Sequence, residues 1–243
     1  MKDRVMKDRV EALNRYCLDR SPEAIIAYVV DQFGGACTLA SSLGAEDQVL
    51  THMYCNGDVN PDIFMIDTGR LHQETYDVAQ KSMDRYGFRS RVFFPQHEAV
   101  EAMVTQHGPN HFYKTVANRQ DCCHVRKVAP LSRALTGYSV WMTGLRRAQS
   151  IERATMPYVE WDDRHHLIKV NPLLMWSKSD VWDYVRAQDV PVNALHNQGY
   201  PSIGCAPCTR AVLPGENDRS GRWWWEDAAK KECGLHLQSR ESA

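Results

Sequence analysis

Short apolar runs recur along the first two thirds of the chain, each followed by a polar or glycine-containing turn and then by a helix-like segment. Runs of this length with such flanks are typical of buried strands. They occupy residues 36–41, 62–67, 91–94 and 138–143. Alternating strands and helices predict a parallel sheet with helices on both faces, an α/β fold. Ligands of such sheets bind at the carboxyl ends of the strands, so the turns after these runs are candidate binding loops.

The segments on either side of these runs have a different character. Residues 8–33 are predicted to be helical, and Ser21-Pro22 marks a helix start inside this stretch. From about residue 190 the chain becomes rich in Pro, Gly, Asn and Trp, which is typical of a flap and tail rather than a second domain. We therefore expect residues 1–243 to form a single domain, with an α/β core over about 36–190 and a loop, flap and tail over about 191–243.

Composition excludes several classes of protein. The 243 residues are 43% hydrophobic and 24% charged, and the formal net charge is -1, so no global charge favours nucleic acid or an anionic membrane surface. No apolar run approaches the roughly 20 residues that span a bilayer. The charged start, residues 1–10, is neither a signal peptide nor an anchor. Eight cysteines without a secretory signal predict a reducing compartment, such as a bacterial cytoplasm.

Four of the cysteines form two close pairs. Cys122 and Cys123 are adjacent, and Cys205 and Cys208 stand in a Cys-x-x-Cys spacing. Four thiolates grouped in this way indicate a zinc or iron-sulfur site. Adjacent cysteines would be strained in holding one tetrahedral zinc ion, whereas a 4Fe-4S cluster offers a separate iron to each sulfur. The tandem pair therefore favours the cluster.

A fifth cysteine, Cys233, stands near the C-terminus in a different setting. Lys230, Lys231 and His236 favour its thiolate, which is the nucleophilic form, and Glu232 opposes it. This pattern indicates a reactive thiol that is separate from the four paired cysteines. Basic residues that could hold an anionic substrate stand within or near the same motifs: Arg126, Lys127, Arg146, Arg147, Arg153, Arg219 and Arg222.

The loop after the first strand, Ser41-Ser-Leu-Gly-Ala-Glu-Asp47, leads into a helix whose N-terminus could bind an anion. It lacks the Gly-Lys-Ser/Thr ending of a Walker loop and the spaced glycines of a dinucleotide fingerprint. Glu46 and Asp47 would also repel a triphosphate unless Mg²⁺ intervened. Kinase, GTPase and Rossmann dehydrogenase functions are therefore disfavoured.

Seven segments, taken together and in this order, resemble the assimilatory adenylyl-sulfate reductases. They are residues 41–47, Ile66-Asp-Thr-Gly-Arg70, Cys122-Cys123, Thr143-Gly-Leu-Arg-Arg147, Cys205-Ala-Pro-Cys208, Gly221-Arg-Trp-Trp-Trp225 and Glu232-Cys-Gly-Leu-His236. One departure is Leu43, where many relatives carry a small hydroxyl residue. The resemblance implies an adenine nucleotide α-hydrolase-like fold, a twisted, mostly parallel sheet of five strands with helices on both faces and a C-terminal flap and tail.

The resemblance also implies a reaction and its residues. Adenosine 5'-phosphosulfate is reduced to sulfite and AMP, and thioredoxin or a glutaredoxin-like protein donates the electrons. Cys233 attacks the sulfate sulfur and forms a Cys S-sulfonate, and the four paired cysteines bind a 4Fe-4S cluster. Substrate binding is assigned to Lys127, Arg219, Arg222 and His236 at the phosphosulfate, to Ser42 and Gly144 near the adenosine, and to Arg147 and Arg153.

Three other functions remain open at this point. The first is the same reaction on the 3'-phosphorylated nucleotide, although reductases with that preference generally lack the paired cysteines. The second is an ATP-dependent adenylating or tRNA-thiolating enzyme, which would need a Ser-Gly-Gly-x-Asp-Ser-like loop that the sequence does not contain. The third is a non-catalytic zinc module, which leaves Cys233 and the arginines unexplained. We expect no nucleic-acid or membrane partner, and a homo-oligomer is allowed.

Overall fold

The computed structural model describes residues 2–57, 60–150 and 153–226. Among these residues the strands form one six-stranded sheet in the order β3-β2-β1-β4-β6-β5. β1 pairs in parallel with β2 and β4, and β4 pairs in parallel with β6, so the expected mostly parallel sheet is confirmed. The strands are β1 (Cys37–Ala40), β2 (Ile63–Ile66), β3 (Arg91–Phe93), β4 (Val140–Met142), β5 (Val159–Asp162) and β6 (Leu167–Val170).

The first four strands coincide with the four apolar runs of the sequence, whereas β5 and β6 were not predicted. These two strands pair antiparallel, with Glu160 opposite Lys169 in the register. The Lys169 Nζ lies 2.8 Å from the Glu160 Oε1, and both side chains are largely buried. Each charged residue interrupts the apolar run of its own strand, so the hydrophobic pattern did not predict these two strands. The sheet consequently has six strands rather than five.

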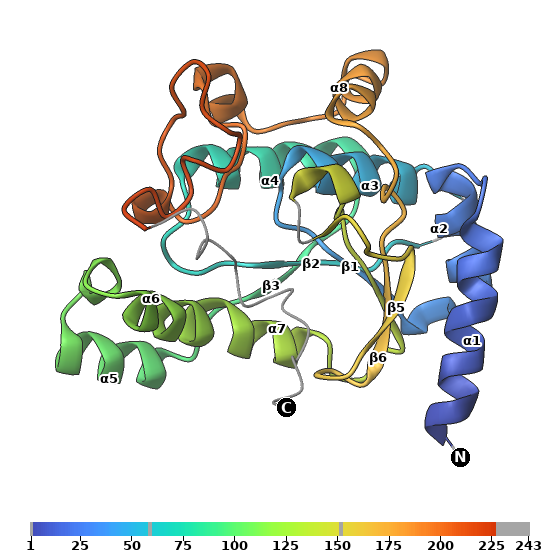
Figure 1. The fold of residues 1–243 in the computed structure, drawn as a ribbon, viewed down its shortest axis with the longest axis horizontal. Coiled ribbons are helices and arrows are strands. Elements are labelled where there is room, and N and C mark those ends of the chain that lie inside the picture. Colours follow the sequence, from blue (N-terminus) through green and yellow to red (C-terminus); the bar gives the residue numbers. More distant parts are fainter. Residues whose placement is uncertain (1, 58–59, 151–152, 227–243) are drawn as a thin grey trace. The chain divides into compact units, whose positions relative to one another are not determined.

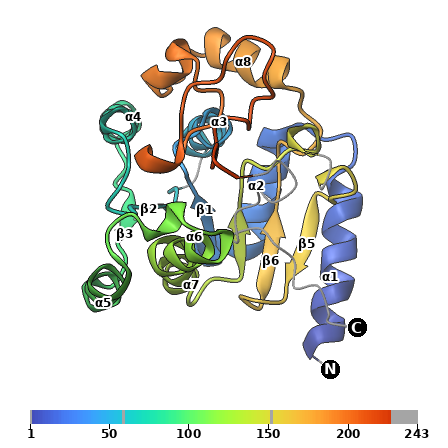
Figure 2. The ribbon, with the colours of Figure 1, turned by 60° about the vertical axis from the view of Figure 1, so that its left-hand side comes forward.

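The described part of the chain contains eight α-helices. The Ser21 Oγ accepts a hydrogen bond of 3.3 Å from the Ala24 N–H, and Pro22 takes the first helical position, so the predicted helix start is confirmed. Figures 1 and 2 show the first helix running beside β5. The helices are α1 (Lys2–Cys17), α2 (Pro22–Phe33), α3 (Ala45–Cys55), α4 (Gln73–Tyr86), α5 (His97–His107), α6 (Val116–Cys123), α7 (Ala129–Ala134) and α8 (Lys178–Ala187).

The chain divides into two compact units, each built from three segments. The first comprises Met1–Phe64, Ala79–Arg91 and Leu135–Val192, and the second comprises Met65–Val78, Val92–Ala134 and Asn193–Ala243. This division cuts across the core expected over 36–190, because two segments of that range belong to the second unit. The single-domain organisation stays a prediction.

Each unit has its own buried apolar residues. In the first unit, side chains from β1, β4 and β6 pack with α2, and Leu39, Val140 and Ile168 are each fully buried. In the second unit, Phe112 and Trp223 pack with Cys205 and Cys208. Thus two of the predicted cluster cysteines are part of the second unit's buried core.

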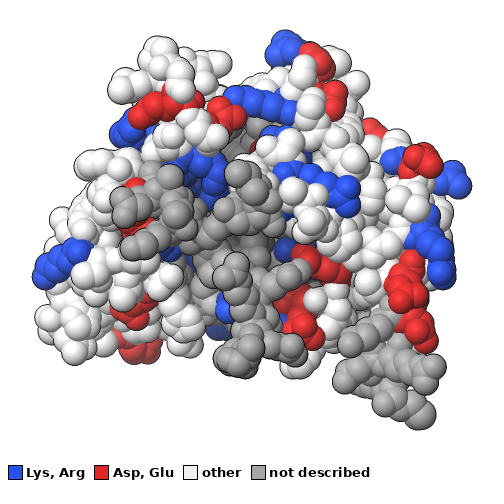
Figure 3. All heavy atoms as spheres, viewed as in Figure 1, with Lys and Arg blue, Asp and Glu red and all other residues white. Residues whose placement is uncertain are grey.

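On the face drawn in Figure 3, acidic and basic side chains are interspersed among uncharged ones. None of the helices in the described ranges combines the length and the apolar character needed to cross a bilayer.

Candidate active site and cluster pocket

The tandem cysteines end a helix that continues through an unusual turn. The Thr115 Oγ1 caps the start of α6 by accepting a hydrogen bond of 3.1 Å from the Asn118 N–H, and Cys122 and Cys123 are the last two residues of α6. Residues His124–Val128 form a π-helical turn, η3, which leads directly into α7. Figure 1 shows α6 and α7 following one another along the chain in the second unit. A π-helical turn within an α-helix accommodates an extra residue and is frequent at functional sites.

The four paired cysteines line one pocket in the second unit. Cys205 and Cys208 reach it from a short 3-10 turn, η7 (Ala206–Cys208), and the tandem pair reaches it from α6. The remaining lining residues are aromatic, proline or basic: Arg70, Phe112, Arg119, Arg126, Lys127 and Pro207. The structure therefore brings together the four cysteines that the sequence singled out.

Burial raises the pKa of two of these thiols. The pKa of the Cys208 thiol is raised to about 12, chiefly by burial; the neighbouring thiols of Cys205 and Cys123 act in the same direction, and Lys127 and Arg222 act against it. Burial also raises the pKa of the Cys122 thiol, and Arg126 opposes that shift. A buried thiolate is costly, so a bound metal centre would have to displace the protons of Cys208 and Cys122.

The metal-binding side chains among the residues that line this pocket are the four cysteines. Within the described residues, no three His, Cys, Asp or Glu side chains are placed to hold one metal ion. Four thiols nonetheless face a single pocket, with basic side chains around it that would offset the negative charge of several thiolates. These residues fit a 4Fe-4S cluster, with one cysteine for each iron.

The loop that follows β2 closes over the cysteines. The Arg126 guanidinium donates a hydrogen bond of 2.7 Å to the Thr68 carbonyl, and the Thr68 Oγ1 lies 3.2 Å from the Cys205 Sγ. Arg70 donates to the Pro109 carbonyl at 2.6 Å and lines the pocket. From the sequence, no function is predicted for Thr68 or Arg70. Their place in the motif of residues 66–70 is the signal from which one could have been predicted.

Lys127 lines the same pocket as Cys123, which stands four residues earlier in the chain. The turn between them is π-helical rather than α-helical, so the shared face arises from a slightly wider turn. Arg222 also belongs to this unit, with its guanidinium 4.9 Å from the ring centre of Trp223. A Cβ on Gly204 would lie 2.3 Å from the Arg222 Nη2, so the glycine provides the space that this arginine occupies.

Arg219 lies in the turn just before Arg222. Its N–H donates a hydrogen bond of 2.9 Å to the Asn217 Oδ1, and its side chain is half-buried. Cys233 and His236 lie outside the described residues.

The first unit holds the predicted adenosine-binding positions. One carboxylate, that of Asp47, accepts hydrogen bonds from the Ser42 N–H at 2.7 Å, from the Ser42 Oγ at 2.6 Å and from the Gly144 N–H at 3.1 Å. Burial raises the pKa of Asp47 to about 6, and the hydrogen bonds from Ser42 oppose that shift. Leu43 has a φ of 63° and supplies no polar side chain, so the hydroxyl of this loop that bonds Asp47 is that of Ser42.

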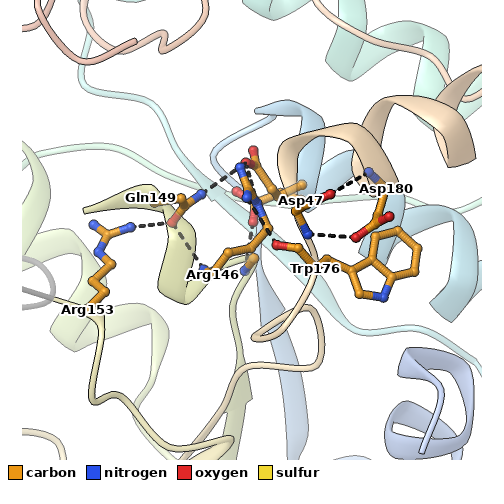
Figure 4. Close-up of polar contacts among 9 residues, drawn as sticks. Asp47, Arg146, Gln149, Arg153, Trp176 and Asp180 are labelled. Carbon is orange, nitrogen blue, oxygen red and sulfur yellow. Dashed lines mark hydrogen bonds and ion pairs between the residues drawn. The ribbon is translucent and has the colours of Figure 1, made fainter. Parts of the chain in front are cut away.

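A second polar network follows β4 in the same unit. Arg146 pairs with the Glu46 Oε1 at 2.8 Å, and the Gln149 Nε2 donates to the same oxygen at 3.0 Å. Arg153 donates in turn to the Gln149 Oε1, as Figure 4 shows. The network holds the Arg153 guanidinium through Gln149.

The Arg147 side chain contacts Met156 and Met175. Its Nε donates to the Met156 carbonyl at 2.8 Å, and its Nη1 lies 3.4 Å from the Met175 Sδ. Ser42, Gly144, Arg147 and Arg153 thus lie in the first unit, whereas Lys127, Arg219 and Arg222 lie in the second.

Comparison with known proteins identifies the family to which the chain belongs. Residues 36–211 match the model of the phosphoadenosine phosphosulfate reductase domain. The chain belongs to the phosphoadenosine phosphosulfate reductase domain family. An adenosine 5'-phosphosulfate reductase of Burkholderia cepacia is 52% identical over 198 residues, which cover 82% of this chain and 79% of that protein. The resemblance inferred from the motifs is confirmed.

Solved structures agree with this placement. A phosphoadenylyl-sulfate reductase from Candida auris, crystallised as a phosphate complex, matches with a TM-score of 0.73 and 26% identity and covers 84% of this chain and 97% of that one. Yeast FAD synthetase, at 12% identity and a TM-score of 0.55, shares the fold over 83% of this chain and 68% of its own. The expected adenine nucleotide α-hydrolase-like fold is confirmed. The family match ends before Arg219, Arg222 and the C-terminal cysteine.

Proposed function

We propose that this chain reduces adenosine 5'-phosphosulfate to sulfite and AMP, with thioredoxin or a glutaredoxin-like protein as electron donor, as a cytoplasmic enzyme of assimilatory sulfate reduction. The observation that carries the proposal is the pocket in which four cysteines are surrounded by Arg and Lys side chains. Similarity to a reductase of this nucleotide over most of the chain supports it.

The proposed first step is a displacement at sulfur. The Cys233 thiolate attacks the sulfate sulfur, an S–S bond forms, the bond from sulfur to the bridging oxygen breaks, and AMP leaves with the electron pair. The product is a Cys233 S-sulfonate. The proposed phosphosulfate contacts are Lys127, Arg219, Arg222 and His236, whose positive charge would stabilise the leaving phosphate.

The second step releases sulfite. A thiolate of the donor attacks the Cys233 Sγ, sulfite departs with the bonding electrons, and a second donor thiol resolves the mixed disulfide. The donor is oxidised by two electrons, and Cys233 returns as a thiol. Electrons therefore reach the substrate sulfur through thiol chemistry at this one residue.

The proposed cluster ligands are Cys122, Cys123, Cys205 and Cys208. When bound, a 4Fe-4S cluster would keep these sulfurs deprotonated and add a fixed charge distribution next to Lys127. Lys127 and Arg126 would then be oriented by their places on the π-helical turn that follows the tandem cysteines. The adenosine is assigned to Ser42 and Gly144, with Arg147 and Arg153 as further contacts.

The 5'-phosphosulfate is preferred over ATP because of the first turn of α3. Asp47 is buried there and already occupies the N–H groups of Ser42 and Gly144, and Glu46 adds a second carboxylate. A triphosphate at this helix N-terminus would meet two acidic groups rather than free N–H donors.

Anaerobic purification followed by iron and sulfide analysis and a sulfite-release assay tests the proposal. Adenosine 5'-phosphosulfate and its 3'-phosphorylated form are compared in wild type, Cys233→Ser and Cys55→Ser. We expect a brown protein, activity with the unphosphorylated nucleotide, and an added SO3 on the Cys233 peptide by mass spectrometry. Full activity in Cys233→Ser would overturn the assignment of Cys233 as the nucleophile. A colourless protein that contains zinc would overturn the cluster. A preference for the 3'-phosphorylated nucleotide would replace adenosine 5'-phosphosulfate as the proposed substrate.

A further inference from the structure

We propose that the ion pair between Arg119 and Glu226 is a positioning clamp for Cys233. The clamp fixes Glu226, the residue seven positions before the nucleophile in the sequence. The inference rests on the proposed function, in which Cys233 is the nucleophile. Neither Arg119 nor Glu226 is assigned a part in making or breaking bonds.

The geometry of the pair is bidentate and buried. The Arg119 Nε donates to the Glu226 Oε1 at 3.0 Å, and its Nη2 donates to the Glu226 Oε2 at 2.9 Å. The side chains are 1% and 4% exposed. Two parallel bonds fix the relative orientation of both planar groups. Desolvation offsets most of the attraction in a buried pair, so the contribution of such a pair is specificity of position more than stability.

The Arg119 end of the clamp belongs to the cysteine helix. Arg119 lies on α6, three and four residues before Cys122 and Cys123, so the three side chains share one helical face. All three line the same pocket. A displacement of this helix would therefore move the anchor of Glu226 together with the tandem cysteines.

The clamp also holds a strained residue. Trp223 is 1% exposed and has a φ of 41°, a backbone conformation that bulky residues rarely adopt. The Arg119 and Arg222 guanidinium carbons lie 4.6 Å and 4.9 Å from its ring centre. Packing of this density holds the turn in one conformation, so Arg119 supports the residue next to Arg222 as well as the start of the tail.

Position at residue 226 matters because of chain length. Cys233 follows Glu226 by seven residues, which can extend over at most about 25 Å. A fixed starting point limits the volume in which the thiolate is found. Releasing it enlarges that volume and lowers the effective concentration of the thiolate at the phosphosulfate.

Glu226→Gln tests the clamp, and Glu216→Gln is its matched control. Glu216 forms a bidentate pair with Arg210, with both contacts at 2.8 Å, ten residues earlier in the same unit. Unlike the clamp, this pair is partly exposed, 36% for Arg210 and 29% for Glu216. Rapid mixing with adenosine 5'-phosphosulfate followed by mass spectrometry gives the rate of S-sulfonation of Cys233. We expect about a 10- to 100-fold slower rate in Glu226→Gln and a rate within about twofold of wild type in Glu216→Gln.

Two further readouts separate positioning from damage to the fold. Iron content and affinity for AMP should stay at wild-type values in Glu226→Gln. Arg119→Lys should slow S-sulfonation as well, and the double variant should be no slower than the worse single variant. A rate that falls only in proportion to lost iron or lost AMP binding would overturn the proposal, as would an unchanged rate.

Trypsin cleavage after Lys230 and Lys231 tests the clamp without any turnover. We expect several-fold faster cleavage there in Glu226→Gln and no change in Glu216→Gln, and equal rates in all three proteins would overturn the clamp. A wild-type protein that forms no adduct on Cys233 would instead overturn the proposed function, and the clamp would then be judged by the cleavage rates alone.

Discussion

The Asp47 Oδ1 accepts a hydrogen bond of 3.1 Å from the N–H of Gly144, a residue 97 positions further along the chain. The other oxygen of the same carboxylate holds Ser42 through both its N–H and its Oγ. One buried side chain thus joins the loop after β1 to the loop after β4. The two residues assigned to adenosine are fixed relative to each other by an acid that contacts both.

Gly144→Ala should destabilise the first unit. A Cβ there would lie 2.5 Å from the Asp47 Oδ1 and 2.8 Å from the Glu46 Cβ, so the loop has to shift. We expect a loss of about 1–3 kcal/mol in the free energy of unfolding, measured by urea denaturation. Gly35→Ala is the control, because nothing lies within 4 Å of its added Cβ. Equal losses in the two variants would contradict the predicted clash.

Asp47 should make the stability of the protein depend on pH in the opposite sense to a salt-bridged acid. Burial raises its folded pKa to about 6 from the ordinary value of 3.8. The folded state therefore holds the proton more tightly, and the resulting stability is present below about pH 4 and is lost as pH rises through about 6. Relative to Asp47→Asn, wild type should lose about 1–2 kcal/mol between about pH 5 and pH 7.5. Urea denaturation of both proteins across this range measures it, and parallel profiles would rule the effect out.

Gly204→Ala should act on Arg222 rather than on the fold. The added Cβ would lie 2.3 Å from the Arg222 Nη2, the end of a flexible side chain that can move away. We expect a change in stability within about 1 kcal/mol but at least a tenfold slower S-sulfonation of Cys233, about 1.4 kcal/mol in the barrier. A double variant with Arg222→Ala should be no slower than Arg222→Ala alone. Additive effects in this cycle would show that Gly204 acts elsewhere.

Cys208→Ser should lose most of its bound iron and unfold at a lower temperature, because a bound metal centre contributes its binding free energy to folding. Cys55→Ser is the control: Cys55 ends α3 in the first unit, and burial raises the pKa of its thiol to about 12. Iron analysis and a thermal scan of the two variants measure the difference. Full iron retention in Cys208→Ser would remove this cysteine from the ligand set.

The sequence predicted those parts of the molecule that depend on local pattern. Four apolar runs became β1 to β4, and the capping Ser21 set the start of α2. β5 and β6 were not predicted, because the charges of Glu160 and Lys169 are paired only when the two strands lie antiparallel. Neither strand's own sequence shows that its charge has a partner.

In the candidate site, too, the features set by local spacing were predictable and the contacts between distant segments were not. The spacing of the tandem cysteines and Lys127 could be read from a few residues, and the pocket contains all of them. Arg119 and Glu226, in contrast, are 107 positions apart and bear no local signature. Arg119 packs against Trp223, whose left-handed backbone conformation could not be predicted from the residue type.

The π-helical turn His124–Val128 makes the length of this segment as important as its composition. Removing one of its residues would turn everything after it by about 100° about the helix axis. Leu131 and Ala134, which are 2% and 1% exposed, would then swing away from the interior, or Cys122 and Cys123 would swing away from their pocket. Single-residue deletions here should therefore be tolerated far less well than substitutions at the same positions.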